Sequence, residues 1–182
     1  MRSFTMRADC RVRSGPCAAG AGRAVPVPGR LRGTELKYGE KTFHLEPWED
    51  GNAIHGFVLN RPWRVLQRSD KEVTGQFQAS VDDPSILKHW PADFRITVRY
   101  TLAGNRLVAN IRIENPSDRE LPFALGTHPY FRVPIGPDGD LDQCVVTVPA
   151  AQYWEREGAL PTGKKLPADG KAALASGMKF SE

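Results

Sequence analysis

Residues 92–114 read ADFRITVRYTLAGNRLVANIRIE, and this stretch decides the fold class. Apolar side chains occupy alternate positions on both sides of Gly104-Asn105: Phe94, Ile96, Val98, Tyr100 and Leu102 before it, and Leu107, Ala109, Ile111 and Ile113 after it. A period of two is typical of a strand with one buried face and one solvated face. These residues therefore predict a β-hairpin that turns at Gly104-Asn105.

Shorter stretches on either side predict further strands. Glu35–Tyr38 and Lys41–His44 form a second predicted hairpin, because a glycine at position 39 suits the first central position of a type II′ turn. Residues 63–66, 73–81 and 144–148 are further strand candidates. Residues 83–89 are the one helix candidate, with Asp83 as the cap and Pro84 in the first turn. The predicted fold class is all-β.

The composition predicts a soluble chain of one domain or part of one. It has 182 residues, of which 40% are hydrophobic and 25% charged. No apolar run approaches the roughly 18–20 residues that a membrane span needs, so no membrane partner is expected. The three cysteines (Cys10, Cys17 and Cys144) suit neither a disulfide framework nor a zinc site. We therefore predict a reducing compartment and a cytoplasmic location.

The basic charge is confined to the beginning of the chain. Residues 1–32 hold seven arginines and one aspartate, whereas the remaining 150 residues carry a net charge of −2. A nucleic-acid partner is not expected, because the body lacks a basic face. In residues 1–29 the apolar side chains follow neither the helical period nor the alternation of a strand. This segment is predicted to be a disordered or non-native basic arm. An organellar transit peptide is the alternative.

Histidines are the first candidates for chemistry, because imidazole titrates near neutral pH. His55 and His128 lie among glycine, proline and aromatic residues in predicted loops, where functional side chains concentrate. His44, in a strand, is expected to be structural or on the surface, and His89, at a helix end, is expected to be structural. The sequence contains no nucleophile elbow and no phosphate-binding loop, and no short spacing suggests a metal site.

Two motifs carry a family resemblance. Asn52-Ala53-Ile54-His55-Gly56-Phe57 with Arg61-Pro62-Trp63, and residues 123–131, reading FALGTHPYF, resemble the two histidine motifs of the aldose 1-epimerase (galactose mutarotase) family. Two weaker matches agree in order: residues 29–33 (GRLRG) resemble the Asn-Arg-Ile-x-x-Gly segment, and residues 160–163 (LPTG) resemble the Leu-Pro-x-Gly loop. The resemblance covers about residues 26–167.

The resemblance implies a galactose mutarotase-like β-sandwich that binds a hexose. Residues 30–182 would form a partial domain of this kind, incomplete at both ends. His128 would be the general acid at the ring oxygen, and His55 would bind the sugar near the reacting centre. Arg30 and Tyr130 would be further substrate contacts. No metal and no organic cofactor is expected.

Three departures from the family pattern keep alternatives open. The family's general base is a glutamate that follows the Leu-Pro-x-Gly loop at a distance, beyond this sequence. A sugar-binding aspartate is expected after that loop and has no match here. At the N-terminal side, the family has strands ahead of the Asn-Arg segment where this sequence has the basic arm, and Gly29 stands where the family has asparagine. Glu155 and Glu157 are the nearest late carboxylates, and nothing in the sequence brings them to the site. Besides an impaired isomerase, a non-catalytic carbohydrate-binding domain or a β-scaffold with inert histidines stays open.

Overall fold

The computed structural model describes the backbone of residues 3–11, 22–24, 27–128, 133–134, 139–170 and 174–179, and side chains from residue 27 to residue 127 and in the later ranges. The described residues belong to two compact units, one up to His128 and one from Val133 onward. Each unit is described by itself.

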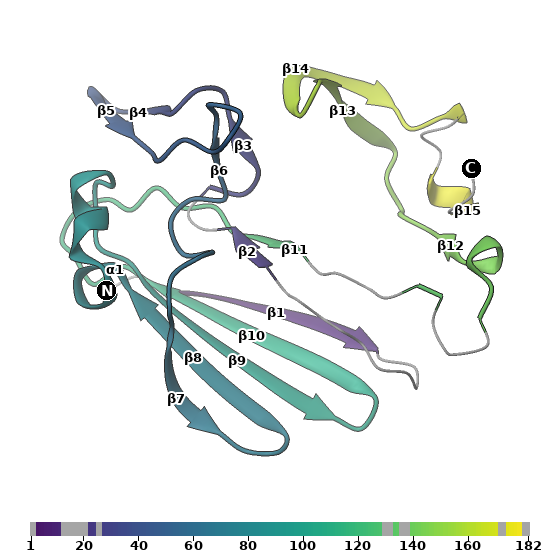
Figure 1. Ribbon diagram of the computed structural model, residues 1–182, viewed down its shortest axis with the longest axis horizontal. Helices are drawn as coiled ribbons and strands as arrows, with labels where there is room; N and C mark the ends of the chain where they lie inside the picture. The colour runs from purple at the N-terminus through teal and green to yellow at the C-terminus, as the bar shows by residue number, and fades with distance from the viewer. Residues whose placement is uncertain are drawn as a thin grey trace. The chain divides into compact units, whose positions relative to one another are not determined.

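A five-stranded antiparallel sheet dominates the first unit. Its strands lie in the order β1-β10-β9-β8-β7 (Figure 1). Their bounds are Ser3–Arg11, Arg106–Glu114, Arg95–Ala103, Glu72–Gln78 and Arg64–Arg68. The hairpin predicted over residues 92–114 is confirmed, since β9 pairs with β10 from Ala103↔Arg106 to Arg95↔Glu114. Gly104 in its turn has a φ of 59°.

Short strand pairs complete the first unit. β4 (Glu35–Tyr38) pairs with β5 (Lys41–His44), β3 (Arg30–Leu31) with β6 (Ala53–Ile54), and β2 (Gly22–Ala24) with β11 (Gly126–His128). The second predicted hairpin is thus confirmed. Its Gly39 has a φ of 59°, as the first central position of a type II′ turn requires.

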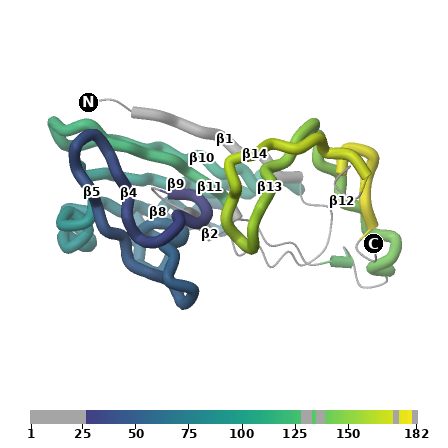
Figure 2. The backbone as a smooth tube through the Cα atoms, turned by 90° about the horizontal axis from the view of Figure 1, so that it is seen from above, coloured from purple at the N-terminus to yellow at the C-terminus, as the bar shows by residue number. Residues whose placement is uncertain are grey.

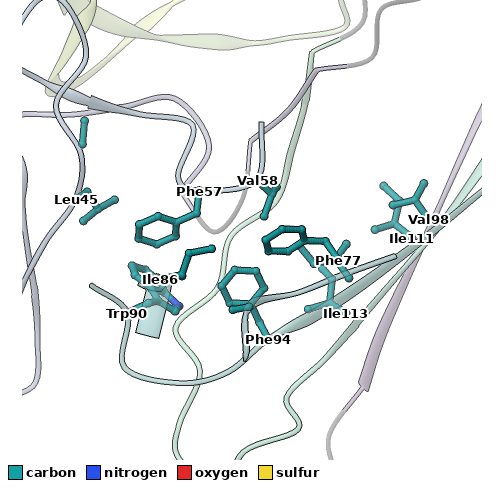
Figure 3. Close-up of a cluster of buried hydrophobic side chains, with 13 residues drawn as sticks. Leu45, Phe57, Val58, Phe77, Ile86, Trp90, Phe94, Val98, Ile111 and Ile113 are labelled. Carbon is teal, nitrogen blue, oxygen red and sulfur yellow. The ribbon is translucent and has the colours of Figure 1, made fainter. Parts of the chain in front are cut away.

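The core of this unit joins one face of the sheet to the segment after His55. Phe77, Val98, Ile111 and Ile113 from β8, β9 and β10 meet Phe57, Val58, Ile86 and Trp90 (Figure 3). Phe77 and Phe94 stack with their ring centroids 6.3 Å apart. Burying a side chain of this size stabilises a fold by about 1.5–3 kcal/mol. The core therefore holds the chain around His55 firmly against the sheet.

The structure corrects the end of one predicted strand. The alternation predicted a strand over residues 73–81, but β8 ends at Gln78 and the α-helix α1 (Ala79–Asp82) follows. Asp82 Oδ2 accepts the Gln78 N–H at 2.6 Å, and Asp93 Oδ1 accepts the Ser80 N–H at 2.9 Å. These two carboxylates accept the backbone N–H groups that would pair with a neighbouring strand if β8 continued.

The predicted helix over residues 83–89 is present as the 3-10 helix η1 (Pro84–Lys88). As expected, the Asp83 side chain accepts the Ser85 N–H at its start. Among the described residues, no helix is long and apolar enough to cross a membrane.

The second unit contains two strand pairs. β13 (Gln152–Glu157) and β14 (Leu160–Pro167) lie side by side (Figure 2). β12 (Val145–Val146), inside the predicted strand at residues 144–148, pairs with β15 (Met178–Lys179). Two 3-10 helices, η2 (Leu141–Gln143) and η4 (Leu174–Ser176), accompany them. The all-β class is confirmed, because strands far outnumber helices among the described residues taken together.

Part of the N-terminal arm is described as strand. β1 pairs with β10 from Ser3↔Glu114 to Arg11↔Arg106, and β2 pairs with β11. Residues 12–21 lie outside the described residues. The predicted division at residues 29 and 30 therefore stays a prediction.

Candidate functional site

Arg30 and His55 occupy neighbouring positions on two paired strands. β3 and β6 are antiparallel, with Arg30 opposite Ile54. One residue further along, the His55 N–H donates to the carbonyl of Gly29 at 3.1 Å. The strand pair thus brings the backbones of two predicted sugar contacts, 25 positions apart in the sequence, to adjacent positions.

The backbone at His55 has an unusual conformation. His55 has a φ of 59°, in the left-handed region, and Gly56 follows with a φ of 64°. A non-glycine residue pays about 1–2 kcal/mol for this conformation, and such residues concentrate at functional sites. The side chain of His55 is half-buried, and its Nδ1 is buried. The conformation fixes the direction in which the imidazole leaves the strand.

Asp50 holds the side chain of Arg30. The Arg30 Nε–H donates to Asp50 Oδ2 at 2.8 Å, and the Asn52 N–H donates to Asp50 Oδ1 at 3.1 Å. The hydrogen bond from Arg30 is the main cause that lowers the pKa of Asp50, and the one from Asn52 adds to it. Asp50 is therefore ionised at neutral pH.

Arg61 ties down the segment that follows His55. Its Nε–H donates to Asp83 Oδ2 at 2.6 Å, and its terminal nitrogens donate to Glu46 Oε1 at 3.2 Å and to the carbonyl of Phe57. The Trp63 indole N–H donates to the Val58 carbonyl at 3.2 Å. Arg61 and Trp63 therefore hold the segment after His55 in place.

The structure describes less of the other two predicted site residues. His128 ends β11, opposite Gly22 in β2, and only its backbone is described. Tyr130 lies outside the described residues, as does Phe131. The convergence of His55 and His128 on one cavity stays a prediction.

Two aromatic residues of the first histidine motif, Phe57 and Trp63, pack in or against the core. Phe57 is 2% exposed and meets Trp90 edge to face, with ring centroids 5.8 Å apart. Trp63 packs against Phe77 with a centroid distance of 5.9 Å. Phe57 has too little exposed surface to stack on a sugar.

His44 and His89 make a structural contact with each other. His89 Nδ1 lies 2.8 Å from the carbonyl oxygen of His44, at hydrogen-bond distance. The His44 side chain is exposed. This contact agrees with a structural role for His89, and the exposed side chain of His44 agrees with a surface position.

The late carboxylates have local partners in the second unit. Glu155 Oε2 accepts a hydrogen bond from Thr162 Oγ1 at 2.7 Å and lies 3.8 Å from Lys164 Nζ. Across the part of the chain that the structure describes, no group of three or more His, Cys, Asp or Glu side chains could hold a metal ion.

Comparisons with known proteins agree with the motifs. The family described as aldose 1-epimerase matches residues 17–180. Human galactose mutarotase is 26% identical over 147 residues, covering 80% of this chain and 42% of that protein. Maltose epimerase of Levilactobacillus brevis is 29% identical over 162 residues, covering 86% of this chain and 45% of that protein. The chain therefore spans somewhat less than half the length of the curated relatives it matches.

Solved structures support the same fold. A galactose mutarotase-like protein from Clostridium acetobutylicum superposes with a TM-score of 0.74 at 26% identity, covering 86% of this chain and 48% of that one. An aldose epimerase homologue from C. elegans has a TM-score of 0.68 at 20% identity, over 87% of this chain and 48% of that one. The predicted galactose mutarotase-like β-sandwich class is confirmed by these neighbours. Because the family match covers most of the sequence, the chain belongs to the aldose 1-epimerase family.

Proposed function

We propose that this chain binds a hexose through Arg30, His55, His128 and Tyr130 and serves the interconversion of its α and β anomers. The observation that supports the proposal is the pairing of β3 with β6, which brings the backbones of Arg30 and His55 to adjacent positions in a member of the aldose 1-epimerase family. The names of two relatives, galactose mutarotase and maltose epimerase, support a sugar as the ligand.

The proposed chemistry is general acid–base catalysis. A general base takes the proton of the anomeric hydroxyl while a general acid gives one to the ring oxygen, and the ring C1–O bond breaks to give the open-chain aldehyde. Rotation about C1–C2 and reclosure on the other face yield the second anomer, with acid and base roles exchanged. A general acid or a general base works best when its pKa lies near the operating pH, and imidazole meets this condition.

Each residue has a separate task in this proposal. His128 donates the proton to the ring oxygen, and His55 hydrogen-bonds the sugar near the reacting carbon. Arg30 and Tyr130 bind hydroxyl groups away from the reacting bond. The scheme needs no metal and no cofactor. We further propose a cytoplasmic location, from the composition.

A non-catalytic carbohydrate-binding domain is the second candidate. It would share the proposed sugar contacts and differ from the isomerase in having no group that takes the proton of the anomeric hydroxyl. Positioned general catalysis supplies about 10²–10⁴-fold, so a site without the base would bind sugar and turn it over slowly.

Polarimetry separates the two candidates. Freshly dissolved α-D-glucose or α-D-galactose is mixed with the purified chain, and the optical rotation is followed against buffer. The isomerase predicts a rate above buffer that His128→Ala removes. Millimolar sugar titration by NMR or calorimetry comes next: binding without turnover supports the second candidate. Absence of both would reject the sugar site and leave a β-scaffold.

A further inference from the structure

Arg30 has a long side chain whose position must be set before it can select a sugar. Arginine has many rotamers, and ordering such a side chain upon binding costs affinity. The side chain of Arg30 is 28% exposed, so core packing alone does not hold it. The residue that orders it therefore matters for binding.

A closed turn delivers Asp50 to Arg30. The Gly51 N–H donates to the Trp48 carbonyl at 2.9 Å, and the Trp48 N–H donates to the Asn52 carbonyl at 2.8 Å. Gly51 has a φ of 75°, which an L side chain rarely adopts. The Asp50 carboxylate also closes the turn from inside by accepting the Asn52 N–H.

The same turn is bonded to the segment that carries Arg30. The Gly33 N–H donates to Asn52 Oδ1 at 2.9 Å, and the Ala53 N–H donates to the Gly33 carbonyl at 2.7 Å. Asp50 and Arg30 are thus fixed in one backbone frame, together with the β3–β6 pair that leads to His55.

Asp50 contacts Arg30 at Nε, so the two terminal nitrogens of the guanidinium can bind a ligand. Asp50 takes the Nε–H of Arg30. Among the described residues, the structure shows no further hydrogen bond or ion pair of Arg30. A planar guanidinium held at Nε has four further N–H groups, on the two terminal nitrogens, and these can donate in pairs to neighbouring sugar hydroxyls.

We propose that Asp50 is a positioning residue of the sugar site, which fixes the guanidinium of Arg30 through Nε so that its terminal nitrogens face the hexose. This inference rests on the proposed function, in which Arg30 binds the sugar. Nothing in the sequence motifs pointed to Asp50.

The test uses a matched pair of variants. Asp50→Asn keeps an oxygen for the Asn52 N–H but loses the charge that holds Arg30. Asp82→Asn is the control, because Asp82 likewise accepts an arginine Nε–H, from Arg64 at 2.7 Å, and one backbone N–H, from Gln78 at 2.6 Å. Melting temperatures of both variants report whether they fold.

Sugar titration by NMR then compares dissociation constants for D-galactose and D-glucose. We expect Asp50→Asn to weaken binding by roughly three- to tenfold, because Arg30 must be ordered anew upon binding, and Asp82→Asn to leave it unchanged. Asp50→Glu should recover part of the loss. Arg30→Gln combined with Asp50→Asn should bind no more weakly than Arg30→Gln alone, since Asp50 acts through Arg30.

Two outcomes overturn the inference in different ways. If the wild type binds sugar and Asp50→Asn binds equally well, or if the two substitutions add, Asp50 does not position Arg30. If the wild type binds neither sugar, the proposed function itself is wrong. The Arg30 Nε–H resonance in a ¹⁵N spectrum gives a sugar-independent check, since it should shift in Asp50→Asn and not in Asp82→Asn.

Discussion

His55 and Gly29 are joined through their backbones, N–H to carbonyl at 3.1 Å, and both have a positive φ, 59° at His55 and 84° at Gly29. Two left-handed residues thus face each other where the β3–β6 pair ends. The geometry beside the candidate site depends on residues that tolerate this conformation.

Substitutions at Gly29 test that dependence. A Cβ at this position would meet nothing within 4 Å, so only the backbone conformation resists a side chain. Gly29→Val should lower the free energy of unfolding by about 1–2 kcal/mol, whereas Gly29→Asn should cost clearly less, because asparagine visits the left-handed region. Urea denaturation measures both. Equal losses would contradict the assigned strain.

His55 can be tested for strain and for binding in one experiment. Gly and Ala both remove the imidazole, but only Gly relaxes at a φ of 59°. We expect His55→Gly to be about 1 kcal/mol more stable than His55→Ala, while both lose sugar binding. Thermal or urea unfolding gives the first comparison and sugar titration the second. A more stable Ala variant would argue against the left-handed conformation.

His44→Ala is the matched histidine control. The contact with His89 uses only the backbone carbonyl of His44, so removing its exposed side chain leaves that bond in place. Sugar affinity should be unchanged in His44→Ala and lost in His55→Ala and His128→Ala. The same titration under one set of conditions compares all three. Equal losses in the three variants would mean that the site assignment is wrong.

Phe57 tests the boundary between core and site. Because Phe57 is 2% exposed, Phe57→Leu should lower stability by about 1 kcal/mol and leave sugar affinity within error of the wild type. Urea denaturation measures the stability of the variant, and sugar titration of the same preparation measures its affinity. Loss of affinity at unchanged stability would show that Phe57 contributes to the sugar site.

Asp83 makes stability depend on acidity. Hydrogen bonds from Ser85, and then from Arg61, lower the pKa of Asp83. A carboxyl with a lowered folded-state pKa stabilises the fold above its unfolded pKa of about 3.9, and the contribution fades as pH falls through the folded-state value. Asp83→Asn should thus be less stable than the wild type at pH 7. The difference should shrink below pH 4. Melting temperatures across pH 2–7 measure this, and a constant difference would contradict the assignment.

The sequence predicted the elements that have one buried face. In β9, Ile96 and Val98 are buried while Arg95 and Arg99 are not, which is the pattern that alternation detects. The β13–β14 hairpin was missed because both of its faces are largely exposed, so no apolar period marks it. The predicted strand over residues 73–81 extends beyond the end of β8 at Gln78. Asp93, 13 positions away in the sequence, accepts the Ser80 N–H, and no local pattern indicates this bond.

The sequence likewise indicated some residues of the candidate site and not others. His55 and Arg30 were found through motifs, and strand pairing brings them together. Asp50 was not singled out, because its bond to Arg30 joins residues 20 positions apart and no local pattern encodes it. The relation of His55 to His128 depends on how β11 lies against the rest, which no periodicity can foretell.

The outer strand of the large sheet has a practical consequence. Among the described strands β7 pairs only with β8, and Val65 and Leu66 on it are 62% and 52% exposed. An apolar edge of this kind can recruit a strand from another molecule and seed aggregation. The chain should therefore aggregate as its concentration rises, which light scattering would detect. Val65→Lys should reduce this aggregation, because a charge on an edge strand disfavours pairing with another molecule.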